Sequence, residues 1–505
     1  MNAQSWLLVT VLCSSLVTGL IIFVLPEENT KTRTVLNMVG ATVKVLGVFV
    51  MGWDLLMHGT LYEVEFSMGP GFNFLLRVDL LSLAFVSLSS NLWFLTTMYA
   101  VGYLEDSHNR SRFFGFFSLC VTASTGVALA GNLITLFIFY EFLTLVTYPL
   151  VVHDATSESL AAGRTYLWYA MSAGAVFFFA VAWLQVLVGP FDFTPGGVLR
   201  SVPGLHRANL IVIFGLLIFG LSVKAALVPM HGWLPGAMVA PAPVSALLHA
   251  VAVVKAGAFG VLRVVLDVYG QGFASELGVL TPLAVVVAAT ILFGSFRALM
   301  QNNLKRRLAY STVSQVSYIA LGAVILAPLA TVGGLTHLVH QGVMKITLFF
   351  CAGILARVRG IHDIDQMNGI GRTMPLTMAM FTVAGLGMIG VPPMAGFVSK
   401  WYLAVGGLQA GEHWVVALLV LSSALNAAYF LPILHAAWFK PVSRNPVGAG
   451  GEQGVLRRGG EAPWVLLVPP LATAVFCLAA GVFAGWTWSP LGVAEQIIFG
   501  REVGP

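Results

Sequence analysis

Apolar runs of about 20 residues recur throughout this 505-residue sequence and constrain its fold more than any other feature. A helix needs roughly 20 apolar residues to cross the hydrocarbon core of a bilayer. A helix also satisfies its own backbone hydrogen bonds there, which an irregular segment cannot do. The sequence therefore predicts an all-α polytopic membrane protein with about fourteen transmembrane helices. The expected spans are 4–25, 35–57, 74–99, 113–131, 133–152, 165–189, 209–235, 243–268, 278–300, 309–327, 331–356, 376–404, 413–438 and 464–488.

The lysines and arginines between these spans predict how the chain lies in the membrane, because cytoplasmic loops carry an excess of both residues. If the odd-numbered loops are cytoplasmic, they hold fifteen: Lys31, Arg33, Arg110, Arg112, Arg164, Lys305, Arg306, Arg307, Arg357, Arg359, Arg372, Lys440, Arg444, Arg457 and Arg458. The even-numbered loops and the tail hold three: Arg200, Arg207 and Arg501. We therefore expect a bacterial inner-membrane protein with both termini on the outer side.

Composition excludes several functional classes. The four cysteines are far apart in apolar runs, so disulfides, iron–sulfur clusters and structural zinc are not indicated. The net charge of +5 reflects loop lysines and arginines and does not indicate nucleic acid. The longest polar loop, 439–463, has about 25 residues and leaves no room for a soluble catalytic domain. We expect no cofactor, no metal, no nucleic-acid partner and no catalytic chemistry in the chain itself.

Ionisable residues deep inside the predicted spans are the strongest functional signal, because a charge in hydrocarbon is costly. They are Glu141, Lys224, Lys255, Lys345 and Lys400, with the histidines His249, His337 and His340. A structural ion pair between Glu141 and Lys224 would explain only two of them. Burial disfavours the charged form of a lysine, so a buried lysine can bind and release a proton. A row of such groups, joined by histidines and water, can conduct protons.

Other charged groups are interpreted differently. Arg263 and Asp79 lie near span ends, where a side chain can reach the membrane surface. Lys44 lies nearer a span centre and stays unassigned. His249 and Lys255 are six residues apart in one predicted span, nearly two turns, so we expect them to face broadly the same way.

Two predicted spans contain helix-breaking residues close to a lysine. Pro229, Gly232 and Pro235 follow Lys224, and the pair Pro392 and Pro393 precedes Lys400. The two spans are five apart, and an odd shift reverses the direction of a span, which indicates inverted repeats. Interrupted helices in corresponding positions are a pointer to an ion site. The predicted division is 1–112 with three helices, 113–268 and 278–438 as two inverted five-helix repeats, and 464–505 with the last helix.

Five stretches carry a resemblance to a known family. They are FIFYEFLTLVTYPLV (137–151), KAALVPMHGWLPGAMVAPAPVSALLHAVAVVKAG (224–257), KRRLAYSTVSQVSY (305–318), HLVHQGVMKITLFFCAG (337–353) and GVPPMAGFVSKWYL (390–403). Together they resemble the antiporter-like membrane subunits shared by Mrp-type cation/proton antiporters, respiratory complex I and membrane-bound hydrogenases. The lysine at position 400 makes the Mrp D-type subunit the nearest likeness.

The resemblance implies roles for individual residues. Glu141 and Lys224 would gate one half-channel, Lys255 would connect the two halves, and Lys400 would face the outer half-channel. His249, His337 and Lys345 also match positions of the family pattern.

The resemblance implies a proton-translocating subunit of a larger complex, either an Mrp-type antiporter or a redox-driven proton pump. Its partners would be other integral membrane subunits, including further antiporter-like subunits, and a peripheral redox arm in the redox-driven branch. Two alternatives remain at this stage. One is a solute symporter, with Lys224 and Lys400 as anion ligands, and the other is a purely structural membrane anchor.

Overall fold

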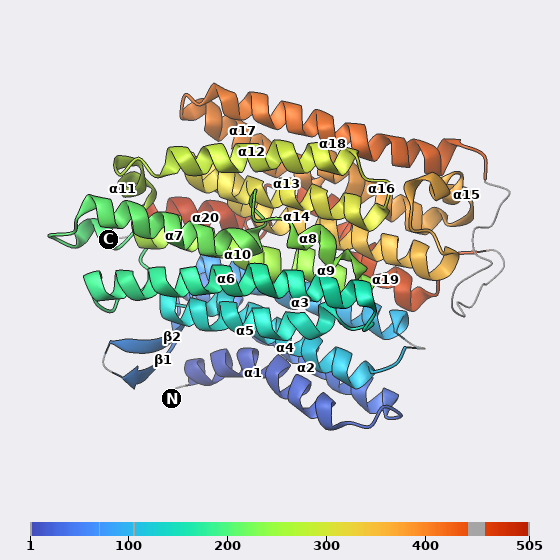
Figure 1. The fold of residues 1–505 in the computed structure, drawn as a ribbon, viewed down its shortest axis with the longest axis horizontal. Helices are drawn as coiled ribbons and strands as arrows, with labels where there is room; N and C mark the ends of the chain where they lie inside the picture. The colour runs from blue at the N-terminus through green and yellow to red at the C-terminus, as the bar shows by residue number, and fades with distance from the viewer. Residues whose placement is uncertain (1–2, 70, 105–106, 443–459, 503–505) are drawn as a thin grey trace.

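Long helices lie side by side along the longest axis of the protein (Figure 1). The computed structural model describes residues 3–69, 71–104, 107–442 and 460–502. Its elements are α1 (Ala3–Val24), α2 (Thr30–His58), β1 (Tyr62–Gly69), β2 (Phe72–Val78), α3 (Leu80–Tyr103), α4 (Arg110–Leu129), α5 (Leu133–Val151), α6 (Ser157–Val188), η1 (Leu199–Ser201), α7 (Arg207–Ala225), α8 (Trp233–Gly236), η2 (Ala237–Val239), α9 (Ala242–Ala250), α10 (Val253–Arg263), the π-helix η3 (Val264–Tyr269), α11 (Gln271–Glu276), α12 (Leu280–Leu299), α13 (Leu304–Val324), α14 (Pro328–Arg359), η4 (Ile364–Met367), α15 (Ile370–Thr373), α16 (Pro375–Ile389), α17 (Ala395–Gln409), α18 (His413–Phe439), α19 (Trp464–Val482) and α20 (Pro490–Glu502).

Eleven helices in the described ranges are long and apolar enough to cross a membrane on their own. The three other predicted spans correspond to α9 with α10, to α13, and to α16 with α17. Two of these are broken into pieces shorter than a full span, and α13 begins with the basic residues 305–307. The helical membrane fold is therefore confirmed, and the number fourteen stays a prediction.

A two-stranded hairpin departs from the predicted all-α fold. Strands β1 and β2 pair antiparallel, so the span predicted at 74–99 begins too early. The helix starts at Leu80, where Asp79 accepts a hydrogen bond from the Ser82 amide at 2.7 Å. Polar and apolar residues alternate in YEVEF, and this period of two is typical of a strand. The apolar residues of β2 run directly into the apolar helix α3, so the sequence predicts a single span there.

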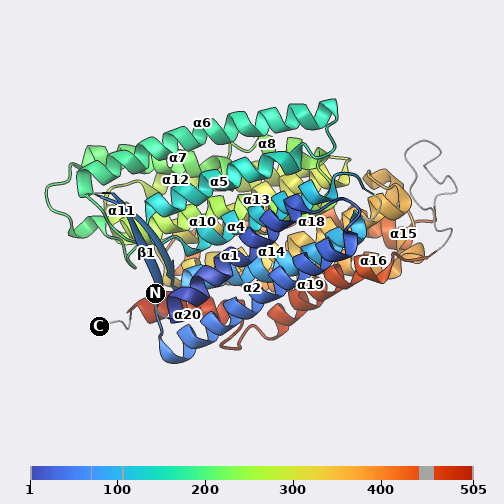
Figure 2. The same ribbon diagram turned by 90° about the horizontal axis from the view of Figure 1, so that it is seen from below.

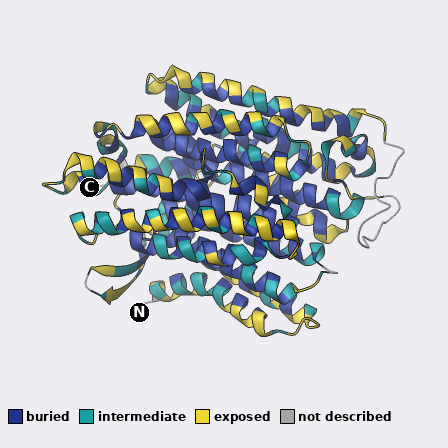
Figure 3. Ribbon diagram, in the orientation of Figure 1, coloured by how far each residue is buried: buried dark blue, intermediate teal, exposed yellow. Residues whose placement is uncertain are grey.

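Helix α14 forms the centre of the bundle, and nearly all of its side chains between residues 330 and 355 are buried. Exposed side chains lie on the outer helices, and buried ones fill the interior (Figure 3). The polar groups on α14 therefore face protein rather than lipid.

The start of α1, the β1–β2 hairpin and α20 lie at the same end of the bundle (Figure 2). The starts of α2 and α4, which carry Lys31 and Arg110, lie at the opposite end (Figure 2). Three basic residues used to predict the orientation, Arg444, Arg457 and Arg458, lie outside the described residues.

Candidate functional site

The first helix break follows Lys224, which lies in the last turn of α7. Ala226 adopts a left-handed backbone with φ of 55°, which ends the helix. Pro229 lies between α7 and α8, Gly232 immediately precedes α8, and Pro235 lies inside α8. The break exposes backbone groups that other helices must satisfy.

Side chains near the break satisfy two of these backbone groups. The Trp233 indole Nε1 donates a hydrogen bond to the Val223 carbonyl oxygen at 2.7 Å, and Thr290 Oγ1 accepts one from the Val228 amide at 3.0 Å. The break is thus held in place by specific donors and acceptors, as backbone at membrane depth requires.

Replacing Trp233 with phenylalanine should destabilise this break. The Val223 carbonyl would lose one of its two donors and keep the Ala226 amide at 3.1 Å, at a cost of about 0.5–1.5 kcal/mol. Thermal unfolding of the assembled protein in detergent measures the effect. The matched control is Trp168→Phe, because Trp168 is 76% exposed on α6 and should leave the unfolding temperature unchanged. Equal unfolding temperatures for both variants would contradict the assigned hydrogen bond.

Glu141 on α5 and Lys224 form an ion pair, with Lys224 Nζ 3.7 Å from Glu141 Oε1. The lysine side chain is 1% exposed and the glutamate 20%. Lys224 Nζ also donates a hydrogen bond to the Tyr140 carbonyl oxygen and lies 3.3 Å from the centre of the Tyr140 ring. The Tyr140 hydroxyl donates to the Gly220 carbonyl oxygen at 3.0 Å, which fixes the ring against α7. The pair predicted from the sequence lies together, beside the break.

Gly174 on α6 leaves the space that the Glu141 carboxylate occupies. A Cβ atom at this position would lie 2.6 Å from Glu141 Oε1. The carboxylate is the mobile end of its side chain, so it can move away at little cost to the fold. A side chain at Gly174 would therefore displace the carboxylate that pairs with Lys224.

Gly174→Ala should leave assembly intact and displace the carboxylate. Because small displacements of reacting groups cost large rate factors, we expect a fall in proton transport of about threefold or more. The matched control is Gly215→Ala, since nothing lies within 4 Å of a Cβ there. The measurement is proton movement in liposomes containing the whole complex. Equal rates for the two variants would show that the position of Glu141 does not matter.

Two further lysines lie at the centre of the bundle, and both are fully buried. Lys255 Nζ donates to the Leu338 carbonyl oxygen on α14 at 2.7 Å. Lys345 Nζ, on α14 itself, donates to the Leu308 carbonyl oxygen at 3.0 Å and to Ser311 Oγ. Within the described residues, neither lysine forms an ion pair with a carboxylate.

The helix that carries His249 and Lys255 is not continuous, so their predicted helical spacing is wrong. His249 lies on α9 and Lys255 on α10, separated by the non-helical residues Val251 and Ala252. The amides of both intervening residues bond to the Leu247 carbonyl oxygen at 3.0 Å. No proline or glycine marks this break, which is why the sequence did not predict it.

His249 nevertheless lies close to the central lysines. Its ring stacks on Phe349 of α14 with 4.5 Å between ring centres, and it lies within electrostatic range of Lys345. Lys345 in turn interacts with Lys255. Both ring nitrogens of His249 and the Gln341 side-chain amide have no hydrogen-bond partner among the described residues. Buried polar groups of this kind are commonly bonded to ordered water.

The second break separates α16 from α17, and Pro392 and Pro393 lie within it. Lys400 Nζ donates to the carbonyl oxygens of Met388 and Ile389, both at 2.9 Å, and to Ser423 Oγ at 3.1 Å. The lysine therefore caps the C-terminal end of α16, where the helix dipole favours a positive charge.

His337 connects the centre of the bundle to this second break. Its Nδ1 lies 2.8 Å from Ser399 Oγ, next in sequence to Lys400. The histidine lies close enough to Lys255 and Lys400 for their charges to act on it. His340, one turn further along α14, lies beside Ala395 at the start of α17. The two histidines thus share the side of α14 that faces α17.

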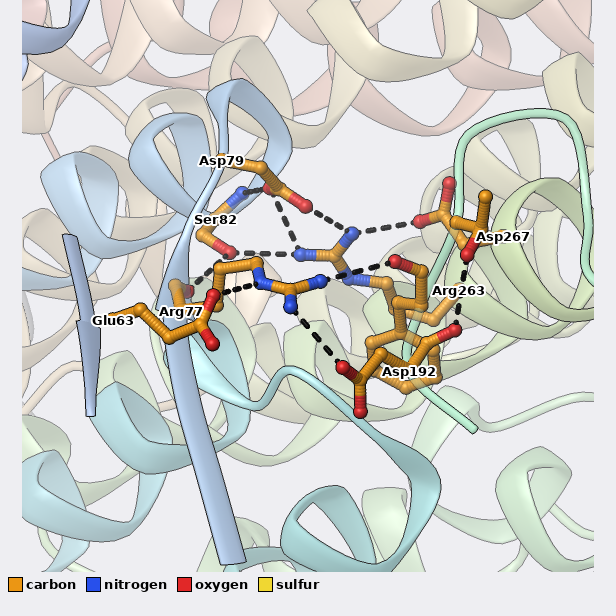
Figure 4. Close-up of polar contacts among 9 residues, drawn as sticks. Glu63, Arg77, Asp79, Ser82, Asp192, Arg263 and Asp267 are labelled. Carbon is orange, nitrogen blue, oxygen red and sulfur yellow. Dashed lines mark hydrogen bonds and ion pairs between the residues drawn. The ribbon is translucent and has the colours of Figure 1, made fainter. Parts of the chain in front are cut away.

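A charged cluster that the sequence did not predict lies at the far end of α10 (Figure 4). Arg263 donates hydrogen bonds to Asp79, Ser82 and Asp267 at 2.7 to 2.9 Å. Its side chain is 1% exposed, so the interpretation that it reaches the membrane surface is wrong. Arg77 of β2 makes a neighbouring set of contacts to Glu63 and Asp192.

Asp79 precedes Arg263 by 184 positions, and only the folded chain brings them together. Among the described residues, no group of three or more His, Cys, Asp or Glu side chains could hold a metal ion.

Comparison with known proteins places this arrangement in a family. The family profile described as "NADH:quinone oxidoreductase/Mrp antiporter, TM" matches residues 130–426. This chain belongs to that family. The matched region contains all eight predicted proton-carrying residues and both predicted breaks, so the sequence-based family assignment is confirmed.

Two relatives and one solved structure illustrate the similarity. The chain is 36% identical to NADH-quinone oxidoreductase subunit N of Desulforudis audaxviator, over 76% of this chain and 77% of that protein. It is 26% identical to the D-type Na(+)/H(+) antiporter subunit of Bacillus subtilis, over 81% and 83%. A chain in the structure of the Mrp complex from Dietzia sp. matches with a TM-score of 0.86 at 23% identity, covering 99% of this chain and 98% of that one. The structural likeness supports the fold.

Proposed function

We propose that this chain carries protons across the membrane as one subunit of a multi-subunit complex. The main support for this proposal is the position of four buried lysines, Lys224, Lys255, Lys345 and Lys400. Two lie at the helix breaks and two lie between them, and only Lys224 has a carboxylate partner among the described residues. A symporter site or a passive anchor gives no reason for the central, unpaired lysines.

The path we propose begins at Lys224, passes Lys255 and His337, and ends at Lys400, with His249, His340 and Lys345 beside its centre. Glu141 gates it electrostatically. A nearby carboxylate favours the protonated form of Lys224, and its movement away favours release of the proton, because burial then dominates. A partner subunit could drive this step by moving or protonating Glu141, which is partly exposed at the surface of the chain.

The two breaks support a division into two inverted five-helix repeats, residues 113–268 and 278–438. Residues 1–112 and 464–505 then flank this unit. The bias of basic residues supports an orientation in a bacterial inner membrane with both termini outside. Lys400 then serves the outer half of the path. The relatives are named as single subunits of larger assemblies, which supports further integral membrane subunits as partners.

The test is proton transport by the purified whole complex in liposomes, with Lys224→Met and Glu141→Gln introduced one at a time. Both variants should assemble and lose most of their transport. Lys440→Met, at an exposed lysine after α18, is the matched control and should transport normally. Full transport by both site variants would support a passive anchor. Transport that depends on an added small anion would support a symporter.

A further inference from the structure

Lys44 on α2 is a fully buried lysine that the proposed path does not use. Its Nζ donates a hydrogen bond to Thr125 Oγ1 on α4 at 2.8 Å and lies 5.5 Å from the centre of the Trp93 ring on α3. No carboxylate in the described part of the chain forms an ion pair with it. Like Lys255, Lys44 therefore lacks a countercharge among the described residues. The amine of Lys44 instead contacts a hydroxyl group and an aromatic ring.

Polar side chains continue from Lys44 along the contact between α2 and α4, and we call this row the α2–α4 seam. Its members on α2 and α4 are Arg33, Asn37, Lys44, Ser111, Ser118, Thr122 and Thr125. The α4 members recur at intervals of seven, four and three residues, so they share one face of that helix. Ser111 and Thr125 are separated by about 21 Å along the helix axis, at 1.5 Å per residue. The row is long enough to reach from the helix ends to the middle of a bilayer.

Hydrogen bonds link members of the seam to one another and to α1. Arg33 Nη1 donates to Ser111 Oγ at 2.6 Å, and Ser118 Oγ donates to Asn37 Oδ1 at 3.3 Å. Thr122 Oγ1 lies 2.8 Å from Ser15 Oγ of α1. Hydroxyl groups both donate and accept hydrogen bonds, so such a row can pass a proton with the help of water.

One end of the seam reaches the protein surface at Glu27, whose side chain is 45% exposed. Its carboxylate accepts hydrogen bonds at 2.9 Å from the amides of Arg110 and Ser111 and lies 3.9 Å from Arg33. Burial raises the pKa of Glu27, but the two amide bonds and Arg33 outweigh it, so the pKa is lowered overall. An ionised carboxylate therefore lies beside the buried guanidinium at this end.

The other end of the seam, in the interior of the bundle, reaches the break between α9 and α10. Ser124, adjacent to Thr125, donates a hydrogen bond to the Val251 carbonyl oxygen at 3.2 Å. Ser124 Oγ also lies 3.5 Å from Ser89 Oγ. Val251 separates the helix that carries His249 from the helix that carries Lys255. The same break that divides the two central residues is thus contacted by the α4 helix at the level of Lys44.

We propose that the α2–α4 seam is a second proton uptake path, in which Lys44 carries the proton and delivers it to the α9–α10 break. The inference rests on the proposed function, because it supplies protons to the same central lysine, Lys255. In the proposed orientation the seam opens on the cytoplasmic side, where α2 and α4 begin. A proton received at Lys44 moves by way of Thr125 and Ser124 to the polar groups around Val251.

The test compares Lys44→Met, Lys44→Arg and Lys31→Met in liposomes containing the whole complex. Lys44→Met should reduce proton transport roughly threefold or more. Lys44→Arg keeps the charge and the donor but cannot release its proton, so it should be as impaired as Lys44→Met. Lys31 is exposed at the start of α2, and its variant should be unaffected.

Several outcomes would overturn the inference. Normal transport by Lys44→Met would show that the seam carries no protons, and normal transport by Lys44→Arg would show a structural role for the cation. If the Lys44 variants do not assemble, Thr125→Val decides, with the exposed Thr42→Val on α2 as its control. Transport that is reduced in Thr125→Val but not in Thr42→Val supports the inference. Equal transport rates for these two variants overturn it. Loss of transport in Lys224→Met with normal Lys44 and Thr125 variants would leave the proposed function standing.

Discussion

Replacing Lys255 with methionine is expected to lower proton transport by the assembled complex roughly tenfold or more, because a positioned proton donor and acceptor commonly contributes factors of that size or larger. Lys255 is the central lysine that interacts with Lys345 and His337, and its amine contacts the α14 backbone at Leu338. Methionine has a similar length and no proton to exchange. The rate is measured from the pH change inside liposomes after the complex is energised.

Stability should barely change in this variant, which separates it from a folding defect. A buried amine that is replaced by an apolar side chain of similar volume loses one hydrogen bond and avoids the cost of desolvation. Blue native electrophoresis and thermal unfolding check that the complex is intact. An intact complex with a normal rate would remove Lys255 from the path.

Replacing Arg263 with methionine is expected to destabilise the protein by about 3–5 kcal/mol, since removing one partner of a buried ion pair leaves the other charge uncompensated. Arg263 contacts Asp79 and Asp267, and the latter is 1% exposed. The cluster joins the N-terminus of α3 to the end of α10 and lies next to the hairpin contacts of Arg77 (Figure 4). The measurement is thermal unfolding in detergent, together with the amount of assembled complex.

Arg200→Met is the matched control for Arg263→Met. Arg200 forms an ion pair with Glu276 at 3.4 Å, but both side chains are more than half exposed. Exposed pairs of this kind contribute roughly 0–1 kcal/mol, so this variant should unfold almost as the original protein does. A destabilisation of similar size in both variants would show that burial does not distinguish the Arg263 cluster.

The sequence predicted the helical membrane fold and the family correctly, because both depend on local features. Apolar length specifies a membrane helix, and the family motifs, such as the stretch around Lys224, are contiguous runs of sequence that can be recognised without the fold. The β1–β2 hairpin was missed although YEVEF carries the alternation of a strand. Because the prediction omits this hairpin, it also begins the third span too early, at residue 74 instead of at Leu80.

Other features could not be predicted because they arise only between distant helices. The break after Ala250 contains no proline or glycine, and a serine from α4 contacts it. Arg263 was placed at a membrane surface because its partner Asp79 is 184 positions away. The sequence alone assigns Lys44 no role, because its hydroxyl partner Thr125 is known only from the folded chain.

The most direct test of the central claim is proton transport by the whole complex after Lys224, Lys255 and Lys400 of this chain are all replaced by methionine. Assembly is verified first, and the complex with Lys440→Met is measured alongside. The account predicts transport reduced roughly tenfold or more in the triple variant and unchanged in the control. Full transport by the assembled triple variant would contradict the claim that protons cross the membrane through the buried lysines of this chain.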